Sequence, residues 1–190
     1  MNFKVISTIA TIALLSIAGC SSTPAPVATT PISISEAPAT ITPIVNPSSS
    51  PGVVLPNATR TPGEVNTSVT QSNISQTVCV SGWTATIRPP AAYTTQLKIK
   101  QLASGYAYNS DTFTRDYEED HLISLELGGS PTAEKNLWPE PYAGTQGARA
   151  KDRVENKLRA LVCNHTITLV TAQHAIATNW WTAYQTYIGG

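Results

Sequence analysis

The sequence has few charged residues, and the two signs balance. Charged side chains make up 13% of the chain, with twelve lysines and arginines against twelve aspartates and glutamates. Only Lys4, Glu36, Arg60 and Glu64 precede Cys79, so ten residues of each sign remain from Cys79 onward. A neutral region lacks the electrostatic footprint of a tight nucleic-acid binder. Any contact with a polyanion is therefore expected to be local, weak and salt-sensitive.

The N-terminus has an apolar run, at residues 5–18, that is too short to span a bilayer. Lys4 precedes this run, and Ala18-Gly19-Cys20 follow as small residues, which predicts a secretory signal over residues 1–20. Its end resembles the lipobox of bacterial lipoproteins, which implies cleavage before Cys20 and a lipid anchor on it. Ser21 would suit sorting to an outer membrane, so we expect anchoring there or at the cell surface. The alternative is an incidental Cys20 and a soluble, secreted product.

Cysteine is scarce, and no Cys-x-x-Cys pair exists, which argues against a structural zinc knuckle. If Cys20 carries lipid, Cys79 and Cys163 remain as an even pair in an oxidising compartment. We expect a disulfide between them. The alternative is two free, buried thiols.

Residues 21–77 are rich in proline, serine and threonine and hold almost no charge and no aromatic residue. Such a composition buries too little apolar area to offset the entropy of ordering. We predict a disordered tether over residues 21–77 and one folded domain over residues 78–190.

Within that domain the pattern predicts an extended segment at residues 78–87, ended by Arg88-Pro89-Pro90. A short helix is expected at residues 94–102, and a strand that leads into a loop at residues 117–127. The turn signal Gly128-Gly129-Ser130-Pro131 closes that loop.

The C-terminal part predicts two helices. Residues 148–163 carry an apolar stripe of Val154, Leu158, Leu161 and Val162. A short strand at residues 166–170 is expected next, before a last helix that Thr171 caps. The apolar face predicted for that helix comprises Ala172, Ile176, Trp180, Ala183, Tyr184 and Tyr187.

One string in the middle of the domain carries the chemistry. Asp120-His121-Leu122-Ile123-Ser124-Leu125-Glu126-Leu127-Gly128-Gly129 is followed by Asn136-Leu137-Trp138-Pro139-Glu140-Pro141. Together with the helix at residues 148–163 and the segment Ala172-Gln173-His174-Ala175-Ile176-Ala177-Thr178-Asn179-Trp180, this string resembles the HNH endonuclease family. Ser124 stands where proline is expected, which makes the loop less rigid without removing a catalytic group. The resemblance implies an α+β fold with a ββα-metal core, flanking strands and C-terminal helices.

The resemblance also implies roles for single residues. His121, whose ordinary pKa lies near neutrality, would take a proton from water, and Asn136 would fix the loop near His121. Asp120 would bind a divalent metal, Mg²⁺ or else Mn²⁺, because a carboxylate is a hard ligand. Asp152 is the first choice for the metal ligand from the helix, and Glu155 is the close second.

Other residues near the string are candidates to contact substrate, namely Lys135, Trp138, Arg149, Lys151 and Arg153. For the four basic residues a solvated helix face is an equal alternative. Tryptophans of this kind are more often part of the core than stacking platforms, and this is the alternative for Trp138.

The expected activity is hydrolysis of phosphodiester bonds in DNA or RNA outside the cytoplasm, with little sequence preference, since no recognition module is visible. The expected partners are the nucleic acid and the membrane that holds Cys20, with no obligate protein partner. The alternative is a non-catalytic surface lipoprotein that uses a nuclease-like fold as a binding module.

Overall fold

A two-stranded sheet and the helices around it form the described part of the chain. The structure, a computed structural model, describes residues 52–144 and 146–189, which lie within the compact unit Ile44–Gly190. The helices are α1 (Trp83–Ile87), α2 (Ala91–Gln101), α3 (Ala148–Cys163) and α4 (Leu169–Tyr187), and the strands are β1 (Tyr117–His121) and β2 (Leu137–Pro141). Short 3-10 and π turns connect them. The expected α+β class is confirmed.

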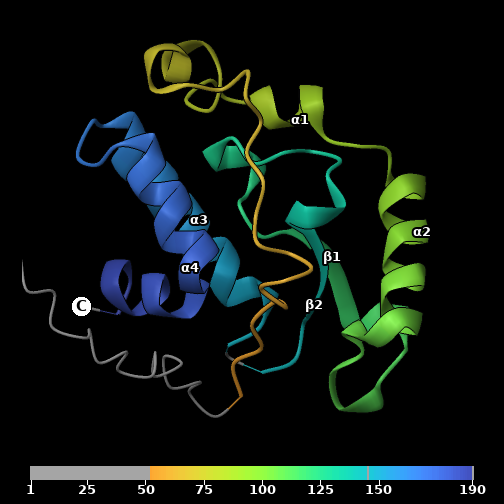
Figure 1. Ribbon diagram of the computed structural model, residues 1–190. Coiled ribbons are helices and arrows are strands. Elements are labelled where there is room, and N and C mark those ends of the chain that lie inside the picture. Colours follow the sequence, from red (N-terminus) through yellow and green to blue (C-terminus); the bar gives the residue numbers. More distant parts are fainter. Residues whose placement is uncertain (1–51, 145, 190) are drawn as a thin grey trace, which may run out of the picture. The chain divides into compact units, whose positions relative to one another are not determined.

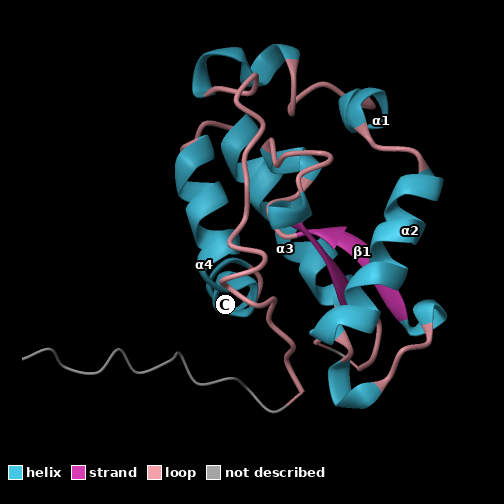
Figure 2. Ribbon diagram, turned by 45° about the vertical axis from the view of Figure 1, so that its right-hand side comes forward, coloured by secondary structure: helices cyan, strands magenta, loops and turns pink. Residues whose placement is uncertain are grey.

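The two strands are antiparallel, so that Tyr117 pairs with Pro141 and His121 pairs with Leu137. They lie between α2 on one side and α3 on the other (Figure 1; Figure 2). Among the described residues β1 pairs only with β2, which leaves its other edge without a partner strand. Side chains alternate along a strand, and Asp120 therefore shares a face with Glu118, Trp138 and Glu140.

The core lies where α3 packs against α4. Val154, Leu158 and Val162 of α3 are fully buried with Ala172, Ile176 and Trp180 of α4. The predicted stripes therefore face the core, although Leu161, Tyr184 and Tyr187 at their margins are only half-buried. The helix predicted at residues 148–163 has the observed bounds, and the one predicted at residues 94–102 begins earlier, at Ala91.

Helix α4 changes direction at Asn179. This residue leaves the helical conformation (φ −167°, ψ 100°), and its side-chain Oδ1 accepts hydrogen bonds from the backbone N–H groups of Trp181 and Thr182. Asn179 thus acts as the N-cap of a second helical stretch. Figure 1 shows the resulting bend before the C-terminus.

The predicted tether is wrong for residues 52–77, which pack on the domain. Val69 and Ile74 are buried in the core, and Thr61 is fully buried. Trp180 donates its Nε1–H to the carbonyl of Val54, and Val65 forms a bridge with Gly129. Composition alone gives the wrong prediction here. A few apolar residues along an extended segment are enough to order that segment when they pack on a core formed by the rest of the domain.

Two predicted extended segments are also wrong. Residues 83–87 form α1, and Arg88 leaves the helical conformation directly before Pro89, as its clash with the proline ring requires. Residues 166–170 form a turn and the start of α4, because the Thr168 hydroxyl accepts a hydrogen bond from the Thr171 N–H and caps the helix there. The predicted cap at Thr171 is thus displaced to Thr168.

The signal over residues 1–20, the lipid site at Cys20 and residues 21–51 of the tether lie outside the described residues. Within residues 52–144 and 146–189, no helix combines the length and the hydropathy of a transmembrane span.

The disulfide between Cys79 and Cys163 is present, as predicted. It joins the segment before α1 to the last residue of α3, and Arg159 strengthens the same junction by donating a hydrogen bond to the carbonyl of Val78.

Candidate functional site

Asn136 organises the loop between β1 and β2. Its Oδ1 accepts hydrogen bonds from the N–H groups of Ile123 (2.9 Å) and Glu64 (3.3 Å), and its Nδ2 donates to the carbonyls of Ile123 and Ser130, both at 3.0 Å. The side chain is fully buried. One amide therefore fixes the backbone that follows His121, and through Glu64 it also fixes the N-terminal segment.

The loop keeps a proline-like shape although it has serine at position 124. Ser124 has a φ of −61°, and its carbonyl accepts hydrogen bonds from Leu127 and Gly129. That φ is the one to which a proline ring is confined. A Cβ at Gly129 would lie 1.7 Å from the carbonyl oxygen of Ile123, so this turn requires glycine.

His121 ends β1 with its ring in a defined orientation. Nε2 lies 3.0 Å from the carbonyl oxygen of Pro131. Because a carbonyl only accepts, Nε2 must carry the proton, and in the neutral ring the lone pair is then on Nδ1. Nδ1 makes no hydrogen bond to a described residue. Burial lowers the pKa of His121 below its ordinary 6.5, despite opposing effects of Pro131 and Asp120, so the ring is a neutral base at pH 7.

Behind His121, the ammonium group of Lys151 binds three acceptors. Nζ donates to Asp120 Oδ2 (2.5 Å), to the carbonyl of His121 (2.8 Å) and to Glu155 Oε1. An ammonium has three donors, so Lys151 is fully satisfied. Burial disfavours its charge, but the surrounding carboxylates outweigh burial and raise the pKa of Lys151. In turn, Lys151 lowers the pKa of Asp120 against the effect of burial.

Glu140 adds a second buried carboxyl beside Asp120. It is 1% exposed, and neither of its oxygens accepts a hydrogen bond from a described residue. Burial first, and Asp120 next to it, raise the pKa of Glu140 well above 4.5. Burial likewise raises the pKa of Glu155 to about 8. At neutral pH the buried cluster is therefore close to electroneutral, with Asp120 ionised, Lys151 charged and Glu140 protonated.

Two hollows meet at His121. The first, here called the α3 cavity, has a volume of about 130 Å³. It is lined by Arg88, Glu118, Asp120, His121, Ser124, Leu125, Glu126, Asp152, Glu155 and Asn156. The second, here called the α2 groove, has a volume of about 290 Å³. It is lined by Arg88, Pro89, Ala91, Thr94, Thr95, Lys98, Glu118, Glu119, His121 and Tyr142.

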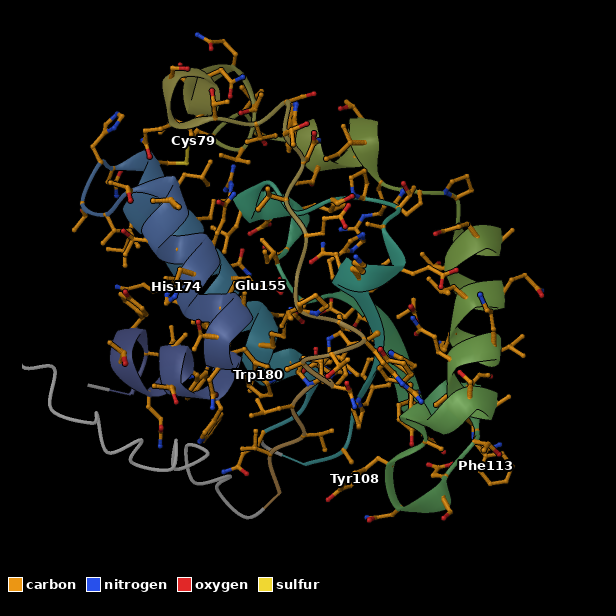
Figure 3. The ribbon with its side chains drawn as sticks, in the orientation of Figure 1. Cys79, Tyr108, Phe113, Glu155, His174 and Trp180 are labelled. Atoms are coloured by element: carbon orange, nitrogen blue, oxygen red, sulfur yellow. A yellow bond between two sulfur atoms is a disulfide. The ribbon has the colours of Figure 1, made fainter. Side chains whose placement is uncertain are left out.

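The predicted base and all three predicted metal ligands line the α3 cavity. Asp120 and His121 reach it together because β1 ends there, and Asp152 and Glu155 reach it from α3. They do not form a closed cage, since the described residues contain no group of three or more His, Cys, Asp or Glu side chains placed to hold a metal ion. Glu155, marked in Figure 3, is the more buried of the two helix carboxylates.

The chemistry of these donors fits a hard divalent cation. Five carboxyl groups line the α3 cavity, and of the two Asp120 oxygens only Oδ2 is taken up by Lys151. Magnesium is commonly held by one or two carboxylates, with water and substrate phosphate as further ligands. Asp120 and Asp152 fit this role better than Glu155, whose Oε1 is bound to Lys151.

Two predicted substrate contacts disagree with the structure. Trp138 is 1% exposed, because it shares the buried face of the sheet, and Lys151 is 0% exposed, because it holds the carboxyl cluster. The Arg153 guanidinium lies over the Tyr184 ring, 5.0 Å from its centroid, and Lys135 is exposed but lines neither hollow. Arg149 is exposed near Asp152 and Tyr142.

Three residues of the site were not predicted. Arg88 lines both hollows, is exposed, and its side chain forms no ion pair or hydrogen bond with a described residue. Glu140 joins the buried cluster, and Tyr142 lines the α2 groove. Arg88 was considered only as the end of an extended segment, and no local pattern indicates that it lies opposite His121. For Glu140, the pairing of β2 with the strand of Asp120 would have been a usable signal.

Comparison of the chain with models of protein families, with curated proteins and with solved structures found no match.

Proposed function

We propose that the domain hydrolyses phosphodiester bonds of nucleic acid with the help of a divalent cation, as the resemblance to HNH endonucleases implies. The observation that carries the proposal is the orientation of His121. Its Nε2–H is bound to the carbonyl of Pro131, and its Nδ1 lone pair is left for a proton in a cavity lined by carboxylates.

Each group of the site has its own role in the proposed reaction. His121 Nδ1 takes the proton from the attacking water, and the hydrogen bond to Pro131 stabilises the imidazolium that results. The water oxygen bonds to phosphorus while the bond from phosphorus to the leaving sugar oxygen breaks, and that oxygen takes up a proton from solvent. Arg88 binds the phosphate, because its exposed guanidinium faces both hollows and offers paired donors. Lys151 and Glu140 hold Asp120 in place.

A divalent cation would be held by Asp120, with Asp152 or Glu155 from α3, and Mg²⁺ or Mn²⁺ suits these oxygen donors. When bound, such an ion offsets the charge that develops on the phosphate oxygens. It also makes the approach of a polyanion to this acidic cavity favourable, which Arg88 and Lys98 alone do not achieve.

Substrate choice and location complete the proposal. Among the described residues no basic stripe marks a recognition surface, so we expect cleavage of DNA or RNA with low sequence preference. The protein would act outside the cytoplasm, anchored to the outer membrane or cell surface by lipid on Cys20. The disulfide between Cys79 and Cys163 supports an oxidising compartment.

The test is a cleavage assay with the purified full chain. Plasmid DNA, an RNA and a chromogenic phosphodiester without a base are each incubated with EDTA, Mg²⁺ or Mn²⁺. Hydrolysis that requires the metal and stops on chelation is the expected result. A chain that is folded, as judged by circular dichroism, and inert toward all three substrates with either metal would overturn the proposal and favour a binding module.

A further inference from the structure

Tyr142 is the one aromatic residue of the described chain that lines either hollow. It follows β2 directly, and the residue is 41% exposed. Its backbone N–H donates a hydrogen bond to the carbonyl of Asp116 (2.9 Å), so the start of the side chain is held in place. Glu118, Arg149 and Asp152 surround the phenol closely enough to act on it electrostatically.

The reacting groups themselves are recessed. His121 is only 4% exposed, and the Asp120 side chain is 16% exposed. A scissile phosphate therefore has to enter the cavity, which a flexible single strand does more readily than a stiff duplex. The α2 groove continues from His121 to Tyr142 and supplies a path for the rest of the strand.

The register of the sheet places the Tyr142 ring away from His121. Pro141, the residue before Tyr142, pairs with Tyr117 at one end of β1, and His121 is at the other end. At ~3.3 Å per residue these ends are roughly 13 Å apart. A base that contacts Tyr142 therefore belongs to a nucleotide that neighbours the cleavage point rather than to the cleavage point itself.

We propose that Tyr142 stacks on an unpaired base of a single-stranded nucleic acid whose scissile phosphate lies at His121. The inference rests on the proposed function and adds the substrate class to it. Base faces are covered in a duplex and free in a single strand, and aromatic rings of proteins stack on them without regard to sequence. Arg88 and Lys98 supply two cations beside Tyr142, in a groove that Glu118 and Glu119 also line.

The test measures binding of a fluorescent single-stranded DNA oligonucleotide to the full chain by anisotropy, with Ca²⁺ as the metal. Tyr142→Ala should raise the Kd by about tenfold, within the ~5- to 150-fold range of alanine substitutions at base-stacking residues. Tyr142→Phe keeps the ring and should bind like the unchanged protein. The matched control is Phe113→Ala, which removes a 61% exposed ring that contacts Arg115 and lines neither hollow. Figure 3 shows Phe113 well apart from Glu155.

A series of oligonucleotides, each with one abasic nucleotide at a different position, identifies the stacked base. With the abasic nucleotide at one position, the unchanged protein should bind more weakly, and Tyr142→Ala should cause no further increase in the Kd. An unchanged Kd for Tyr142→Ala, or an equal loss on duplex and on every abasic oligonucleotide, would overturn the stacking role. Hydrolysis by the unchanged protein separates the two proposals. If the unchanged protein hydrolyses none of the plasmid DNA, the RNA and the chromogenic phosphodiester, the proposed function fails, whereas an unchanged Kd for Tyr142→Ala in a hydrolysing protein rejects only the inference about Tyr142.

Discussion

His121 shows how one backbone carbonyl determines the chemistry of a side chain. The hydrogen bond to Pro131 sets the tautomer, and burial sets the direction of the pKa shift. Both depend on the loop that Asn136 holds. A histidine in solution has neither property, so the resemblance in sequence identifies the residue, and the fold gives it a defined tautomer and a lowered pKa.

The pH dependence of hydrolysis follows from this shift. The active form of His121 is neutral, and burial lowers its pKa, so the neutral form persists to a pH below 6.5. The rate should rise with pH as His121 loses its proton, with the midpoint of the rise below pH 6.5. A pH–rate profile with saturating metal measures this. An acidic limb centred clearly above 6.5 would contradict the assignment of His121 as the base.

Lys151 has a structural role that differs from the phosphate contact predicted for it. Lys151→Met keeps the volume but leaves Asp120 and Glu155 buried without a cation, which should lower the free energy of unfolding by about 3–5 kcal/mol. Chemical denaturation measures this. Lys157→Met, an exposed change on the same helix, should have little effect. A stable Lys151→Met protein with weakened substrate binding would instead restore the original prediction.

At the scale of elements, the sequence predicts what its periodicity encodes. Helix α3 has the expected bounds because Val154, Leu158 and Val162 recur on one face, and α2 and the strand at His121 are found close to their predicted places. Segments 83–87 and 166–170 were predicted wrongly because short runs of β-branched residues do not distinguish a strand from a capped helix. There, Pro89 and Thr168 decide the outcome.

The candidate site also contains residues that the sequence predicts and residues that it does not. Asp120, His121 and Asn136 lie in one motif and could be located from the sequence. Arg88 and Tyr142 come from separate elements and line one groove with His121 only through the packing of α2 and the sheet. The burial of Trp138 and Lys151 was also beyond prediction, because it depends on which face of β2 and α3 meets the core.

The disulfide ties α3 to the segment before α1. It closes a separation of 84 residues, and a cross-link of that span restricts the unfolded chain by about 4–5 kcal/mol. The double variant Cys79→Ser/Cys163→Ser should lose about this much stability in urea titrations under oxidising conditions. Reductant should destabilise the unchanged protein and leave the double variant unaffected. Equal midpoints for the two proteins would show that the cross-link contributes nothing.

At the scale of the whole molecule, the folded domain extends further toward the N-terminus than the composition suggests. Residues 52–77 supply core side chains, the bridge between Val65 and Gly129, and the N–H of Glu64 that binds Asn136. The segment therefore contributes both to stability and to the geometry of the loop at His121.

This extension predicts different outcomes for two truncations. A protein that begins at residue 52 should unfold cooperatively, whereas one that begins at residue 78 should lack a cooperative thermal transition, because Val69, Ile74 and Leu55 no longer cover the core. Calorimetry of the two proteins is the measurement. A cooperative transition in the shorter protein, at the same midpoint temperature as in the longer one, would show that residues 52–77 belong to the tether and not to the folded domain.

The proposed function requires the Nδ1 atom of His121 to remove a proton from water in a cavity that binds a phosphodiester. The decisive experiment compares the metal-dependent hydrolysis rate of His121→Ala with that of His174→Ala, a substitution on the exposed side of α4, away from the strands (Figure 3). We expect His121→Ala to lower the rate by about 10²- to 10⁴-fold and His174→Ala to leave it unchanged. A His121→Ala protein that is folded and hydrolyses at the unchanged rate would contradict it.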